Sequence, residues 1–243
     1  MKILVTSATS RIGRAVADAL TDSYDVTRTD LPDHGGGKDG IVACDLNHDE
    51  ATDDLVSGMD IVIHPGFGAH SGDATWLIDF HTRRSYNLLR ACVDQGVPRA
   101  IYLSTLRLLE DYPERMTVSE RWKPRPSTDD EILAVHLGEY TFREYAREEP
   151  ISTTILRLGF PVVDGPSANA QSSGETAALA VEDLGTAVKS AINAELTGYQ
   201  ILHVQSPVSN ARYLMGAAEI AIGYPPSREL LARDSLAGEG AAR

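Results

Sequence analysis

Short apolar runs alternate along the chain with longer segments in which apolar residues recur every three or four positions. The first pattern predicts buried strands and the second amphipathic helices. We expect strands at 3–6, 25–29, 41–44, 60–64, 100–104 and 151–156, and helices at 12–20, 49–56, 75–95 and 128–147. This alternation predicts an α/β fold with a doubly wound parallel sheet and right-handed crossovers.

The composition changes after residue 157 toward Gly, Ser, Ala and Pro. Here the pattern predicts a helix at 181–194, a strand at 200–204 and a final helix at 210–222. We therefore expect residues 1–157 to form the core and residues 158–235 a small cap that completes the same domain. Residues 236–243 are small and polar, which is typical of a frayed tail.

Composition narrows the class of protein. The 243 residues include 35 acidic and 22 basic side chains, for a formal charge of −13, which disfavours nucleic acid and anionic membranes as partners. The two cysteines, Cys44 and Cys92, are too few for a disulfide framework or a zinc site. Apolar runs fall well short of the roughly 18 residues that a membrane span needs. A soluble, cytoplasmic protein without a metal is expected.

The first strand leads through a short turn directly into a helix, an arrangement whose backbone N–H groups and helix N-terminus can bind a pyrophosphate. The residues placed to do so are Ser7, Thr9, Ser10, Arg11, Ile12 and Gly13. Asp30 ends the second strand, where a carboxylate can bond both ribose hydroxyls and repel a 2′-phosphate. NAD is therefore expected rather than NADP.

Several segments in order match one family. The turn matches the pattern T-G-x-x-G-x-x-G at Thr6 and Gly13, with serines in place of its first two glycines. Further matches are Asp45-Leu46, His64-Pro65-Gly66, residues 87–91, 96–99 and 102–105, and Arg157-Leu158-Gly159. In these segments the chain resembles the extended short-chain dehydrogenase/reductase superfamily, that is, the NAD-dependent epimerase/dehydratase family. Its length and the ending Gly223-Tyr224-Pro225-Pro226 are most similar to the short subgroup that includes uronate dehydrogenases.

The resemblance implies a Rossmann-like fold that binds NAD. It adds to the expected cofactor contacts the residues Asp45, Leu46, His64, Pro65, Gly66 and Ser104. It also implies a homodimer formed through the helices at 75–95 and 128–147. Ser10 puts a hydroxyl where bare backbone approaches phosphate in the family, so NAD binding is expected to be of modest affinity.

The family's catalytic pair is missing. Its members use a Tyr as acid/base, a Lys four residues later that lowers the Tyr pKa, and a Ser or Thr that orients the substrate oxygen. Thr105 matches the last of these, and alignment through Gly138-Glu139 puts Glu131 at the Tyr position and Val135 at the Lys position. No Tyr-x-x-x-Lys occurs anywhere in the chain, so the usual proton relay is absent whatever the register.

Each candidate residue has a second interpretation. Glu131 is either a substitute acid/base or an exposed carboxylate near a helix N-terminus, where anions are favourable. Thr105 either faces a ligand or simply ends a strand. The histidines that could supply a base or metal ligands lack metal-binding spacing; they are His64, His70, His81 and His136.

The substrate side offers few cations. From residue 158 to residue 210 there is no Arg and only one Lys, Lys189, which disfavours a nucleotide-sugar and favours a small polar, sugar-like substrate. The sequence therefore predicts an NAD(P)-binding oxidoreductase of the epimerase/dehydratase type with altered acid/base residues. The alternatives are a non-catalytic protein that senses a dinucleotide, or a scaffold that has lost the nucleotide as well.

Overall fold

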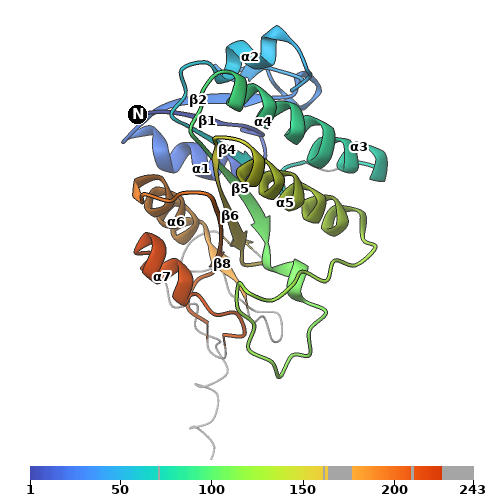
Figure 1. Ribbon diagram of the computed structural model, residues 1–243, viewed down its shortest axis with the longest axis vertical. Helices are drawn as coiled ribbons and strands as arrows, with labels where there is room; N and C mark the ends of the chain where they lie inside the picture. The colour runs from blue at the N-terminus through green and yellow to red at the C-terminus, as the bar shows by residue number, and fades with distance from the viewer. Residues whose placement is uncertain (71, 161, 164–176, 209–210, 226–243) are drawn as a thin grey trace, which may run out of the picture.

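A seven-stranded sheet runs through the centre of the molecule (Figure 1). The computed structural model describes residues 1–70, 72–160, 162–163, 177–208 and 211–225. The strand order is β3-β2-β1-β4-β5-β6-β9, and every neighbouring pair is parallel. The strands are β1 (Lys2–Val5), β2 (Asp25–Asp30), β3 (Val42–Ala43), β4 (Ile61–Pro65), β5 (Arg99–Thr105), β6 (Ser152–Leu158) and β9 (Tyr199–Val204). A small separate sheet pairs β7 (Val162–Val163) with β8 (Leu179–Ala180). The expected fold class is confirmed.

Helices cover both faces of the sheet (Figure 1). One face packs against α1 (Arg11–Thr21), α6 (Val181–Asn193) and α7 (Gly216–Ile222). The other face packs against α2 (Glu50–Val56), α4 (Ser85–Asp94) and α5 (Asp130–Glu148), with α3 (Ala74–Asp79) beside α5. Each face has its own hydrophobic core. Ile3 and Val5 point into the core beneath α1 and α6, and Leu4 points into the core beneath α4 and α5. Burial on both faces explains why the strands read as continuous apolar runs.

The long helix expected at 75–95 is interrupted. It consists of α3, a π-helical turn η2 (Phe80–Arg84) and α4, so the expectation of one regular α-helix was wrong at its centre. Hydroxyl groups bond to backbone carbonyls around this turn: Thr82 Oγ1 to Ile78 O at 2.5 Å, and Ser85 Oγ to Phe80 O at 3.2 Å. Such side-chain bonds compete with the regular helical ladder.

The final helix begins later than expected, at Gly216 rather than at residue 210. Residues before it pair with a loop instead: Val118 N donates to Arg212 O, and Leu214 N donates to Val118 O, both at 2.9 Å. Residue 210 and the expected frayed tail at 236–243 lie outside the described residues. The division of the chain after residue 157 stays a prediction, although β9 of the expected cap pairs with β6 of the expected core.

Three 3₁₀- or π-helical turns connect these elements: η1 (Pro32–His34) after β2, η2 before α4, and η3 (Leu106–Leu109) after β5. The first and third follow the carboxyl ends of their strands, where ligands bind in open α/β sheets. None of the helices in the described part of the chain is long and apolar enough to cross a membrane.

Candidate functional site

The turn after β1 keeps a glycine-like shape without its first two glycines. Ser7 has a φ of 49°, in the left-handed region that favours glycine. The Ser10 hydroxyl donates to Ser7 O at 2.7 Å and accepts from Gly13 N at 3.0 Å, so it caps α1. A Cβ on Gly13 would lie 2.1 Å from Ser7 O, which explains why glycine is kept there. The Ser10 hydroxyl is thus bonded within the turn itself.

Asp30, at the end of β2, is held by a complete set of hydrogen bonds. Its Oδ2 accepts from Thr9 N at 2.8 Å and from Thr9 Oγ1 at 2.7 Å. Its Oδ1 accepts from Leu31 N and is paired with His70 Nε2, both at 2.8 Å. Burial alone would raise the pKa of this carboxyl, but the bonds from His70 and Thr9 outweigh it and the pKa is lowered. The Asp30 side chain is fully buried and ionised.

Aromatic rings close the space beside Asp30. The His34 ring lies 4.2 Å from the His70 ring and 5.0 Å from the Trp76 ring, and Trp76 stacks on Phe80 at 5.1 Å. A pocket at the carboxyl ends of β1, β2 and β3 is too narrow to admit a water molecule. Its lining residues are Thr6, Ser7, Thr29, Asp30, Leu31, Cys44, Leu46 and Phe80.

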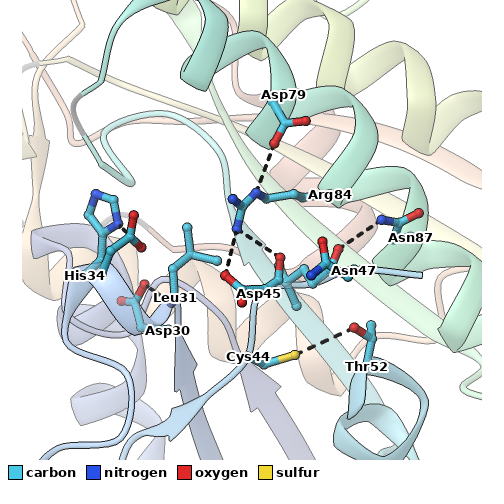
Figure 2. A network of polar contacts seen from close by, with 12 residues as sticks. Asp30, Leu31, His34, Cys44, Asp45, Asn47, Thr52, Asp79, Arg84 and Asn87 are labelled. Carbon is cyan, nitrogen blue, oxygen red and sulfur yellow. Dashed lines mark hydrogen bonds and ion pairs between the residues drawn. The ribbon is translucent and has the colours of Figure 1, made fainter. Parts of the chain in front are cut away.

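The Asp45-Leu46 pair after β3 is fixed by residues that precede and begin α4. Arg84 Nη1 donates to Asp45 O at 2.9 Å, and Asn87 Nδ2 donates to Leu46 O at 3.0 Å. Figure 2 shows Arg84 between Asp79 and Asp45, with Asn87 reaching toward the same loop. Leu46 is buried with a φ of 51°. Leu46 therefore lines the pocket beside Asp30, whereas Asp45 is exposed.

His64, in β4, is a buried structural clamp. Its Nδ1 lies 2.6 Å from Thr6 Oγ1 and its Nε2 lies 3.1 Å from Ser85 Oγ, which links the turn after β1 to β4 and α4. Burial lowers its pKa to about 3, so the ring is neutral. The expected cofactor contacts of His64, Pro65 and Gly66 stay a prediction.

The Tyr102 side chain of β5 leaves no room for a Cβ atom at two glycines near the site. A Cβ on Gly66 would lie 2.3 Å from the Tyr102 ring, and one on Gly138 would lie 2.2 Å from its hydroxyl oxygen. The Tyr102 hydroxyl donates to Val135 O at 3.4 Å and lies 2.9 Å from His81 Nδ1. Because burial raises the pKa of this phenol well above its usual value, it cannot act as a base near neutral pH.

Glu131 lies in the first turn of α5 and faces the loop after β4. Its Oε1 accepts from Gly68 N at 3.2 Å. It also lines a cavity of about 390 Å³ together with Gly68, Ala69, His70, Gly72 and Leu77. Val135, one helical turn further along, is fully buried. Glu131 is thus the candidate acid/base that the structure places at a cavity.

Thr105 and Ser104 are both fully buried at the end of β5. The Thr105 Oγ1 accepts from Arg107 N at 3.2 Å and caps the turn η3. The Ser104 Oγ donates to Glu139 Oε1 at 2.6 Å. Ser104 is therefore bonded to the helix α5, and Thr105 to the turn that follows its own strand.

A buried ion pair beneath the site was not singled out by the sequence. Arg157 Nε and Nη2 donate to the two carboxylate oxygens of Glu139 at 2.8 and 2.7 Å, and both side chains are almost fully buried. Arg157 of β6 lies opposite Ser104 of β5 in the sheet register, so all three polar groups meet under α5. Both residues stood in matched segments, but only the fold brings them into contact.

The kinds of residue fit a dinucleotide: a turn with a helix N-terminus, Gly13 and an acidic residue at the end of β2. His70 occupies one carboxylate oxygen of Asp30, and the pocket beside Asp30 is too narrow to admit a water molecule. His70 and Trp76 were not expected here, since neither has a sequence spacing that relates it to Asp30. Among the described residues, no group of three or more His, Cys, Asp or Glu could hold a metal ion.

Comparisons with known proteins find chains of similar sequence and similar fold. L-arabinose 1-dehydrogenase (NAD(P)(+)) of Haloferax volcanii is 24% identical over 93% of this chain and 96% of its own. The structure of glucuronic acid dehydrogenase from Chromohalobacter salexigens is similar with a TM-score of 0.80 and 24% identity, over 94% of this chain and 85% of that one. A mutant of the uronate dehydrogenase from Agrobacterium tumefaciens in complex with NAD has a TM-score of 0.78 and 20% identity, with the same coverage.

These likenesses below 25% identity establish the fold. The family follows from a direct match, because the model of the NAD dependent epimerase/dehydratase family covers residues 3–189. The expected resemblance and the expected cofactor class, NAD, are confirmed at the level of the family. The chain belongs to the NAD-dependent epimerase/dehydratase family.

Proposed function

We propose that the protein is an NAD-dependent oxidoreductase that acts on a small polar, sugar-like substrate with Glu131 as its acid/base. The observation that carries the proposal is the Glu131 carboxylate on a cavity of about 390 Å³, beside the loop that follows β4. The relatives named for arabinose and uronate oxidation support a sugar or a sugar acid as the substrate class.

Each proposed residue has one task. When bound, the nicotinamide ring supplies a hydride acceptor; the chain's residues hold the dinucleotide and move the proton. The turn from Ser7 to Gly13 and the N-terminus of α1 are proposed to hold the pyrophosphate. Asp30 is proposed to hold the adenosine ribose and to favour NAD over NADP, because its ionised carboxylate repels a 2′-phosphate.

The proton of the substrate hydroxyl is proposed to pass to a Glu131 carboxylate oxygen. Thr105 is the proposed orienting group for the substrate oxygen, since a hydroxyl that accepts one bond still carries an O–H donor. A general base in place contributes about 10²–10⁴-fold to such a reaction. Without the family's Tyr and Lys, turnover is expected to be slow and to depend on Glu131.

A turnover screen tests the proposal. Aldoses and sugar acids are offered with NAD or NADP, and the reduced nicotinamide is followed by its absorbance. Glu131→Gln should abolish the rate while leaving NAD binding in place. Glu148→Gln, which removes an exposed carboxylate at the other end of α5, is the matched control and should change nothing. Turnover that survives Glu131→Gln would contradict the proposal.

The second candidate is a non-catalytic protein that binds a dinucleotide as a signal. The specific observation in its favour is Val135, which is fully buried and whose carbonyl is bonded to Tyr102. The sequence alignment assigns Val135 to the position of the family's lysine. Measurable NAD binding with no turnover on any substrate of the screen would favour this candidate.

We further propose a homodimer formed through the helical segment at 75–95, which comprises α3, η2 and α4, and the helix at 128–147, which is α5. The rings of Tyr86 on α4 and Tyr140 on α5 are 50% and 51% exposed, which is high for large aromatic side chains on neighbouring helices. Light scattering at micromolar concentration should give the mass of a dimer, and a monomer would contradict the proposal. A cytoplasmic location is proposed with it, since Cys44 and Cys92 are free thiols.

A further inference from the structure

His70 closes Asp30 from outside the nucleotide-binding turn. The other donors to this carboxylate are Thr9 and Leu31, which belong to the turn after β1 and to the end of β2. His70 comes from the loop after β4, yet its Nε2 lies 2.8 Å from Asp30 Oδ1, and the two side chains are 7% and 0% exposed. Moving His70 would uncover one carboxylate oxygen and leave the bonds from Thr9 and Leu31 in place.

The same loop packs against the residues around Asp30. The His70 ring packs against His34 at 4.2 Å and lies edge-on to Trp76 at 6.1 Å. Ala69 packs with Leu31 and other apolar side chains in a small cluster of its own, apart from the two cores of the sheet. A segment whose contacts are few and local can open without unfolding the core.

The loop has a fixed end and a conformationally permissive one. Gly66 N and Phe67 N both donate to Leu103 O, at 2.9 and 3.0 Å, which ties the start of the loop to β5. Gly68 has a φ of 64° and an open position next to Ile12 at the start of α1. Its N–H donates to Glu131 at 3.2 Å. A displacement of residues 68–70 therefore changes the surroundings of Asp30 and of Glu131 together.

We infer that residues 66–70 form a gate that is held closed by His70 on Asp30, and that a dinucleotide must displace His70 to bind. Opening exchanges the His70 bond of Asp30 for bonds to the ribose hydroxyls. It also releases Glu131 from Gly68, so the proposed acid/base is freed when the cofactor is in place. The inference rests on the proposed function for the roles of Asp30 and Glu131.

The gate is tested by NAD binding, measured by titration calorimetry in the absence of any substrate. His70→Ala removes the charge-assisted bond to Asp30 from the free protein, whereas in the NAD complex this bond is already broken. The substitution should therefore tighten NAD binding by on the order of 10-fold or more. His48→Ala, which removes an exposed histidine far along the chain from the gate, should leave the affinity unchanged. In an Asp30→Ala background, His70→Ala should no longer tighten binding by this factor.

A second measurement reports on the gate without a ligand. In His70→Ala the amides of Gly68 and Ala69 should exchange with solvent faster than in the wild type, while those of β4 and β5 keep their protection. Affinity for NAD that is unchanged or lower in His70→Ala would overturn the gate, as would a protein that binds no NAD in either form. If His70→Ala binds NAD more tightly but no turnover is found in the substrate screen, the gate stands and only the proposed function is contradicted.

Discussion

Three histidines are buried as neutral rings, and acid should unfold the protein through them. His64, His81 and His203 are at most 1% exposed. Burial lowers the pKa of each to about 3, with smaller contributions from His64 at His81 and from Arg157 at His203. In the unfolded chain a histidine titrates near 6.5. The unfolded state therefore binds more protons than the folded state between about pH 6.5 and pH 3.

The sign and the size of the effect follow from this difference. A folded pKa below the unfolded one means that the full stability is present above about pH 6.5 and is lost as the pH falls toward 3. At pH 5 the loss is about 2 kcal/mol per histidine relative to pH 7, or about 6 kcal/mol for all three. That is comparable to the whole stability of a typical domain, ~5–15 kcal/mol. We therefore expect unfolding well before the pH at which most carboxylates become protonated.

Urea denaturation at a series of pH values from 7.5 to 4.5, roughly spanning the histidine titration, measures the loss directly. His203→Asn keeps a donor for Leu214 O and should reduce the fall in free energy of unfolding by about 2 kcal/mol at pH 5, whatever it costs at neutral pH. His48→Asn, at an exposed position, should leave the slope unchanged. A stability that stays flat between pH 7 and pH 5 would refute the reasoning.

The remaining predictions concern packing and charge under α5. Gly138→Ala puts a methyl group 2.2 Å from the Tyr102 hydroxyl oxygen and should lower the free energy of unfolding by about 1–3 kcal/mol, whereas Gly216→Ala, with open space around it, should be neutral. Glu139→Gln removes the charge partner of the buried Arg157 guanidinium and should cost about 3–5 kcal/mol. Urea denaturation checks both; a Gly138→Ala protein as stable as the wild type, or a Glu139→Gln protein within experimental error of it, would contradict them.

The order of the strands and helices could be read from the chain because each depends on a local period. Apolar runs such as Ile61–Pro65 are buried on both faces, and helices such as α5 bury one stripe. The interrupted helix at η2 could not be read, since its hydroxyl-to-carbonyl bonds do not change the apolar period. The late start of α7 depends on pairing with Val118, almost one hundred residues away in sequence.

The same division holds at the candidate site. Sequence alone determined that Gly13 and Asp30 follow the first two strands, and that no Tyr-x-x-x-Lys exists in any register. Tertiary structure alone decided that His70 covers Asp30 and that Glu131 faces the loop after β4. The physical reason is the distance along the sequence over which each feature is determined. The periodicity of buried positions and the shapes of turns are set by neighbouring residues. Hydrogen bonds between elements form only after the sheet has brought distant strand ends to one edge.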